Sequence, residues 1–271
     1  MSLRINTNVA ALNAYNNLAA NQAKQSSSFE RLSSGLRINK AADDAAGLSI
    51  SQGLTSQING MTQAVSNAQD GINVAQIADG ALGTVQNILQ RMRTLAVQAS
   101  NSGSQDTAST AAAQSELSQL NTQLDNISSQ TAFGGTKLLD GSYSAKAFQV
   151  GANAGETISL TLTSSDSTTL GTNGLDLTSG ASAAITAIDT ALGTVSASRS
   201  AIGATQNQLN YTVANLQTAI TNVTASRSNI TDADLAGEVT SMTQAQILTS
   251  AATSVLAQAN SAPQAILKLL Q

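Results

Sequence analysis

The chain lacks the residues on which the commonest catalytic sites depend, since its 271 residues include no histidine, no cysteine and no tryptophan. A Ser-His-Asp triad, a Cys-His pair, an H-E-x-x-H zinc helix and a cysteine zinc cluster are therefore excluded. The 16 acidic and 12 basic residues leave carboxylate pairs and Ser-Lys pairs as the only catalytic groups that the sequence could supply. No nucleophile elbow, phosphate loop or dinucleotide fingerprint is present. The sequence therefore predicts a protein that is not an enzyme and that holds no metal or cofactor.

Aromatic residues are also scarce, at 2% of the chain, whereas apolar residues reach 41%. The core must then consist of Ala, Leu, Ile and Val, which suits closely packed helices. So few rings offer little to stack on bases, and we expect no nucleic-acid partner.

Long hydrophobic runs are missing as well. No run approaches the ~20 residues of a membrane span, and polar residues interrupt 1–17 throughout. We therefore expect neither a membrane partner nor a cleavable signal peptide. The absence of cysteine fits a cytosolic protein or an exported one without disulfides.

Apolar periodicity predicts a mainly α fold with very long helices. One stripe runs without proline from Ile50 to Ala96 at spacings of three, four or seven. A shorter stripe follows from Leu117 to Ile127, and a third runs from Ile185 to Ile230. Such lengths are typical of coiled coils and bundles. We expect the N- and C-terminal halves to form a long antiparallel bundle, whose Asn-, Gln-, Ser- and Thr-rich faces contact neighbouring molecules.

The period changes between the two halves. Residues 157–163 alternate strictly between polar and apolar, and Phe148 to Val150 precede them across a Gly-bounded turn. This pattern predicts a small β-hairpin region near 143–180, which is too small to fold without the helices beside it.

The two ends of the chain are helical but weakly apolar. Burying one large side chain contributes only ~1.5–3 kcal/mol, so neither end is expected to fold stably alone. We expect them to become ordered on assembly with neighbouring molecules. The predicted assembly contacts are Ile5, Val9, Leu12, Leu32, Leu36, Val255, Leu256, Leu267, Leu269 and Leu270.

Charge differs between the ends. Five basic residues and one acid occur through residue 40, whereas three acids and one lysine occur from residue 231 onward. This pattern fits two ends that lie side by side, and equally fits two solvated helix faces.

Local motifs at both ends resemble those of bacterial flagellins. The N-terminal motifs are 30–39 (ERLSSGLRIN), 43–47 (DDAAG) and 67–72 (NAQDGI), and the C-terminal ones are 245–248 (AQIL), 253–260 (TSVLAQAN), 263–264 (PQ) and 269–270 (LL). The resemblance covers nearly the whole chain. It implies a secreted, extracellular subunit that self-assembles into the flagellar filament, the propeller of bacterial motility.

The same resemblance implies a domain organisation and partners. Residues 1–44 with 229–271 would form a terminal coiled coil lining the filament core, and 45–228 the helical bundle with its hairpin. Since only about 143–180 separates the helical halves, the outer variable domains of larger flagellins are expected to be absent. Implied partners are further copies of the chain, the flagellar export chaperone, the filament cap and the hook-filament junction proteins.

One helix surface carries a further implication of the resemblance. Gln90, Arg91, Leu95 and Glu116 match flagellin positions recognised by the animal receptor Toll-like receptor 5, and in the filament this surface would contact a neighbouring subunit. Residues 90–98 alone fit a solvated helix stretch with Leu89, Met92 and Ala96 facing inward.

Three alternative interpretations fit the sequence less well. Asp43 and Asp44 could form an acid/base or metal pair, but adjacent carboxylates rarely converge, and capping of a helix starting near Ala45 is favoured. An intracellular coiled-coil scaffold would need denser charges beside its apolar seam. A membrane-surface helix would need more basic residues than the N-terminal block supplies.

Overall fold

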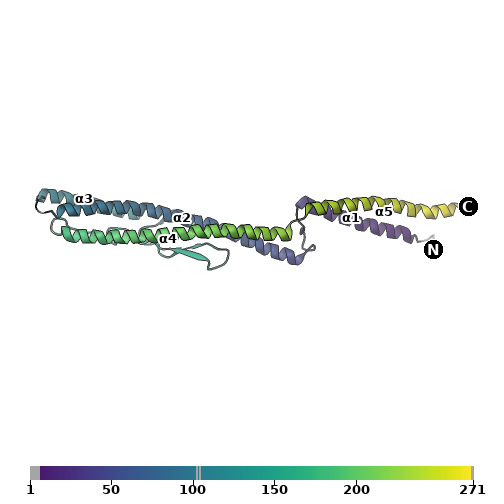
Figure 1. Cartoon of the computed structure of the whole chain (residues 1–271), viewed down its shortest axis with the longest axis horizontal. Coiled ribbons are helices and arrows are strands. Elements are labelled where there is room, and N and C mark those ends of the chain that lie inside the picture. The colour runs from purple at the N-terminus through teal and green to yellow at the C-terminus, as the bar shows by residue number, and fades with distance from the viewer. Residues whose placement is uncertain (1–6, 102, 104, 270–271) are drawn as a thin grey trace. The chain divides into compact units, whose positions relative to one another are not determined.

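Helices dominate the computed structural model, which describes residues 7–101, 103 and 105–269, with 262–269 described by their backbone alone (Figure 1). The helices are α1 (Val9–Ser34), α2 (Ala45–Ala99), α3 (Thr107–Gln130), α4 (Ala181–Thr231) and α5 (Leu235–Leu269). The strands are β1 (Ala132–Phe133), β2 (Thr136–Lys137), β3 (Lys146–Gln149) and β4 (Thr157–Leu160). The predicted mainly α fold, with a small β region between its helical halves, is confirmed.

The chain divides into two compact units. One unit joins the two ends of the chain, up to residue 56 and from residue 222 onward, and the other comprises 57–221. In the first unit α1 packs against α5, so segments from opposite ends of the sequence lie side by side.

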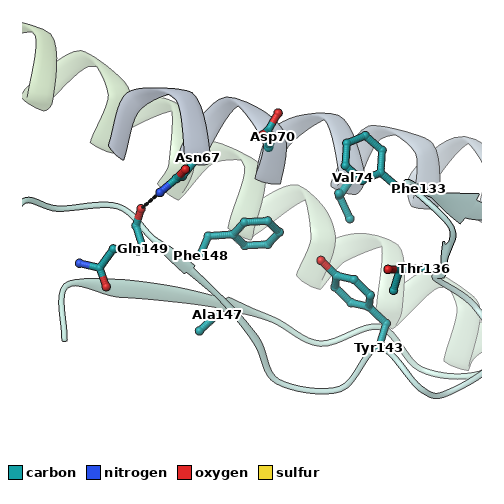
Figure 2. A pocket seen from close by; sticks show the side chains of 9 residues that line it. All are labelled: Asn67, Asp70, Val74, Phe133, Thr136, Tyr143, Ala147, Phe148 and Gln149. Atoms are coloured by element: carbon teal, nitrogen blue, oxygen red, sulfur yellow. Dashed lines mark hydrogen bonds between the residues drawn. The ribbon is translucent and has the colours of Figure 1, made fainter. Parts of the chain in front are cut away.

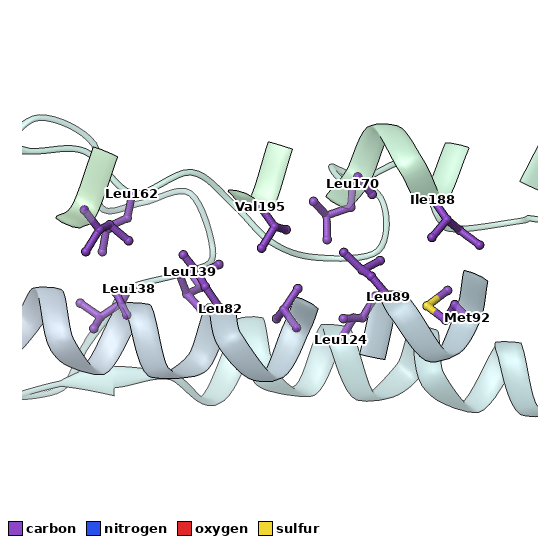
Figure 3. Packing of buried hydrophobic residues seen from close by; sticks show 14 of the residues in the cluster. Leu82, Leu89, Met92, Leu124, Leu138, Leu139, Leu162, Leu170, Ile188 and Val195 are labelled. Carbon is purple, nitrogen blue, oxygen red and sulfur yellow. The ribbon is translucent and has the colours of Figure 1, made fainter. Parts of the chain in front are cut away.

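The core of the 57–221 unit forms where α2, α3 and α4 bring their apolar stripes together (Figure 3). Its largest fully buried side chains are Leu82, Leu89, Met92, Leu117, Leu124, Leu138, Leu139, Leu160, Leu177, Ile188, Ile202 and Leu209. Four of these leucines, Leu138, Leu139, Leu160 and Leu177, come from the strands and loops between α3 and α4. The segment between the helices is therefore part of the bundle's own core.

The predicted β-hairpin is present as an antiparallel pair of β3 and β4. Lys146 pairs with Leu160 and Gln149 with Thr157. Along β4, Ile158 and Leu160 are buried while Thr157 and Ser159 are exposed, which is the alternation that the sequence showed.

A second hairpin was not predicted from apolar periodicity. Strands β1 and β2 pair antiparallel around Gly134 and Gly135, whose φ angles are 56° and 83°. Two consecutive residues with positive φ are the signature of a two-residue turn that glycine adopts without steric cost. The Gly-Gly dipeptide was the available signal, but strands of two residues are too short to show a period.

Capping fixes where α2 begins. The Asp44 carboxylate accepts a hydrogen bond from the Gly47 amide at 2.8 Å, as an N-cap residue does. Asp43 instead accepts from the amides of Asn39 at 3.0 Å and Lys40 at 2.9 Å in the preceding loop. The capping prediction is thus confirmed for Asp44. It is wrong for Asp43, because its carboxylate binds amides of the preceding loop and not those of the first turn of α2.

Candidate functional site

An ion pair joins α2 and α3 at the surface predicted to make contacts. Arg91 donates from Nε to Glu116 Oε1 at 2.7 Å and from Nη2 to Oε2 at 3.0 Å. These hydrogen bonds lower the pKa of Glu116 and raise that of Arg91, so both groups stay charged at neutral pH. The paired geometry holds the guanidinium in one orientation.

The four residues predicted for this surface differ in exposure. Gln90 and Arg91 are exposed and Glu116 is partly exposed, whereas the Leu95 side chain is only 2% exposed and belongs to the core. Residue 95 lies one helical turn beyond residue 91, where α2 meets its neighbours. The surface itself is therefore formed by Gln90, Arg91 and Glu116, and Leu95 contributes by packing beneath it.

Arg93 faces another neighbour. It donates from Nε to Asp189 Oδ1 of α4 at 2.6 Å, and from Nη2 to Oδ2 at 3.3 Å. Arg199 of α4 contacts α2 in the same way, with its Nε 2.7 Å from Asp79 Oδ1. Three paired guanidinium–carboxylate contacts thus link α2 to the helices on either side of it.

The α1 and α5 helices of the other unit are held together differently. The buried residues on these two helices, where their side chains are described, are Ala14, Ser28 and Ala245. Polar contacts supplement this thin interface, because Asn8 Nδ2 donates to the Ala259 carbonyl at 2.8 Å and Arg31 lies 3.8 Å from Glu238. The predicted proximity of the two chain ends is confirmed. Arg31–Glu238 is the one ion pair between these helices among the described residues, so opposite charge contributes little to holding them together.

Large apolar side chains of α1 and α5 remain in solvent. Phe29 is 66% exposed and Ile247 64%, and the predicted contacts Val9, Leu12 and Val255 are each more than half exposed. Leu36 is also exposed, whereas Leu32 and Leu256 are partly buried. Ile5 and Leu270 lie outside the described residues, as do the side chains of Leu267 and Leu269. Tyr15 and Leu235 are further exposed apolar residues that the weak periodicity did not single out.

Other kinds of site are not found in the part of the chain that the structure describes. Its acidic residues nowhere form a group of three that could hold a metal ion. None of its helices is long and apolar enough to cross a membrane.

Comparison with known proteins identifies the family. The model of the bacterial flagellin N-terminal helical region matches residues 5–144, and that of the C-terminal helical region matches residues 185–270. A flagellin of Bacillus subtilis is 41% identical and covers 99% of this chain and 100% of its own length. A flagellin of Halalkalibacterium halodurans is 45% identical, over 98% and 99% of the two chains. This chain belongs to the bacterial flagellin family.

The fold of this flagellin is similar to a solved relative. The crystal structure of Bacillus cereus flagellin matches with a TM-score of 0.51 and 30% identity, over 56% of this chain and 88% of that one. As a flagellin, the protein is a structural subunit that self-assembles into the extracellular filament of the bacterial flagellum. The alternative of an intracellular coiled-coil scaffold is not favoured.

Proposed function

We propose that this flagellin polymerises through its two ends, with 1–44 and 229–271 forming the terminal coiled coil that lines the filament core. Residues 45–228 then form the outer bundle, without projecting variable domains. The exposed apolar side chains of α1 and α5 support this assignment most directly. Each large side chain gains ~1.5–3 kcal/mol on burial, and the helix pair itself buries small residues. In the filament, neighbouring copies of the chain bury these exposed apolar side chains.

Amide hydrogen exchange tests whether the ends depend on assembly. In the dilute monomer we expect fast exchange in 9–34 and 235–261, and strong protection in 74–96 and 184–202, because only the latter segments pack around a continuous core. In the filament the two terminal segments should become protected as well. Equal protection of all four segments in the monomer would contradict folding on assembly.

The Gln90, Arg91 and Glu116 surface has a second proposed role. It contacts a neighbouring subunit in the filament and, in the monomer, Toll-like receptor 5 of an animal host. An exposed, oriented guanidinium supports this proposal, because arginine is frequent among the residues that dominate interfaces.

Arg91→Ala should weaken receptor activation by the monomer roughly tenfold or more and should also reduce motility. Arg93→Ala is the matched control, because it removes an ion pair of the same kind from the opposite side of α2. Both variants should keep their helix content, since alanine favours helices. Receptor reporter assays and swimming assays make the comparison. Equal losses from the two variants, or none from Arg91→Ala, would rule out a special role for this surface.

The same proposal includes three kinds of partner protein besides further copies of the chain. The exported, secreted chain is received by the flagellar export chaperone through its leucine-rich end, is placed beneath the filament cap and meets the hook-filament junction proteins at the base. It catalyses no reaction and binds neither nucleic acid nor membrane. The composition supports this, because the chain has no histidine or cysteine and few aromatic rings.

A further inference from the structure

A cavity of about 380 Å³ lies between α2 and the strand region of the 57–221 unit (Figure 2). Its apolar lining includes Val74 and the rings of Phe133, Tyr143 and Phe148. The whole chain contains only three phenylalanines and three tyrosines. A protein that builds its core from aliphatic residues therefore gathers aromatic rings from three separate segments around one cavity.

Tyr143 gives the cavity an unpartnered polar group. The residue is only 7% exposed, and the hydroxyl end of its ring points toward Phe148 across the cavity (Figure 2). Among the described residues, none forms a hydrogen bond with this hydroxyl. Burial raises the pKa of Tyr143, so the group stays neutral and can both donate and accept. The hydroxyl is open to the space of the cavity, because the buried side-chain atoms without a partner among the described residues are Arg31 Nε, Asn121 Oδ1 and Thr249 Oγ1. A guest in the cavity can therefore replace water as its hydrogen-bond partner.

The charge at the cavity is negative. Asp70 of α2 is the one charged residue that lines it, and no described residue pairs with its carboxylate. The neighbouring amide of Asn67 is already satisfied, since Nδ2 donates to the Gln149 carbonyl at 2.9 Å and Oδ1 accepts from Gln63 at 3.0 Å. Thr136 adds a hydroxyl that has no partner among the described residues. No basic side chain lines the cavity, so an anionic guest would find no charge to pair with.

We propose that this cavity binds an organic cation that carries a flat or hydrocarbon body, such as an amidinium, a guanidinium or an alkylammonium. The body packs between the rings, whose faces attract positive charge. Asp70 pairs with the cation at the rim, and the Tyr143 hydroxyl accepts a hydrogen bond from it. The cation comes either from a free small molecule or from a basic side chain of a neighbouring copy.

Three probes of one shape and different charge test the proposal on the full-length monomer. Benzamidinium is positive, benzamide neutral and benzoate negative, and their binding is measured by calorimetry and by the NMR shifts of the aromatic rings. Benzamidinium should bind roughly tenfold more tightly than benzamide, and benzoate should not bind measurably. The shifts should fall on Phe133, Tyr143 and Phe148. Equal binding of the three probes, or shifts confined to other rings, would overturn the proposal.

Substitutions identify the groups responsible. Asp70→Asn preserves shape and should make benzamidinium and benzamide bind equally. Tyr143→Phe should weaken benzamidinium binding several-fold without loss of helix content. Tyr211→Phe is the matched control, because Tyr211 is 79% exposed on α4 and should leave binding unchanged. If Asp70→Asn and Tyr143→Phe both leave the affinity for benzamidinium intact, the site is not the cavity.

A last comparison separates the two sources of the cation. If benzamidinium binds filaments as well as monomers, the cavity serves free small molecules. If it binds the monomer alone and slows polymerisation, a basic side chain of the neighbouring copy fills the cavity in the filament. Failure to bind either form would overturn the proposal.

Discussion

Removal of residues 1–40 and 231–271 together is expected to abolish filament formation and to leave a soluble, helical monomer. The truncated chain loses α1 and α5, which carry most of the exposed apolar side chains. It keeps the whole 57–221 unit, whose core contains its own large leucines and isoleucines. Circular dichroism should show a cooperative thermal transition, because that core is continuous. Seeded polymerisation followed by sedimentation and electron microscopy should show no filaments.

The full-length chain, seeded in parallel, is the positive control for this experiment. Filaments formed by the truncated chain would show that the bundle alone carries the polymerisation contacts, and the assignment of the ends to the filament core would be wrong. Loss of the thermal transition would instead show that the bundle depends on the ends for its own folding.

Two large-to-small substitutions are expected to separate folding from assembly. Leu89 is fully buried among α2, α3 and α4, so Leu89→Ala should lower the free energy of unfolding of the monomer by about 2–5 kcal/mol. For a unit of this size the melting temperature falls by about 2–4 °C per kcal/mol. Ile247 is 64% exposed on α5, so Ile247→Ala should change monomer stability by less than about 0.5 kcal/mol.

The order of the two effects should reverse in polymerisation. Ile247→Ala should raise the critical concentration for filament growth several-fold, because a side chain that neighbouring copies bury is lost. A third variant, Gln246→Ala, changes the adjacent residue of α5 and is the local control. Denaturation of the monomers and sedimentation of the polymers provide both measurements. An unchanged critical concentration for Ile247→Ala would mean that this face of α5 stays in solvent in the filament.

The sequence predicted the helices well because their signal is redundant. The stripe from Ile50 to Ala96 repeats over many turns, so a few polar interruptions do not hide the period. The β3–β4 hairpin was predictable for the same reason, since Ile158 and Leu160 alternate with polar residues. The β1–β2 hairpin depends on one turn and two residues on each side, which no period can reveal.

The pairing of side chains was harder to predict. Helical periodicity placed Arg91 and Arg93 on different sides of α2, but it could not say that Glu116 and Asp189 would meet them. Those contacts depend on the relative translation of three helices, which is set by packing over their whole lengths. Leu95 was expected at the surface because the resemblance to flagellins implied it, yet α2 has neighbours on two sides and buries this residue in the core.

The aromatic cavity could not be predicted at all. Phe133, Tyr143 and Phe148 lie outside the periodic helical segments, and they meet only because the strand region folds back over α2. The composition shows that aromatic residues are scarce, but it cannot predict which of them lie close together in the folded chain.

The ion pairs between helices also bear on the mechanics of a rotating filament. A bundle of rods bends easily when the rods slide past one another, and becomes much stiffer when cross-links prevent the sliding. The pairs Asp79–Arg199, Arg91–Glu116 and Arg93–Asp189 cross between α2 and its neighbours at different heights, so they oppose such shear. Each pair is accessible to solvent, and dissolved salt screens its charges. The resistance of the subunit to bending should therefore decrease as ionic strength rises, while its apolar core stays unchanged.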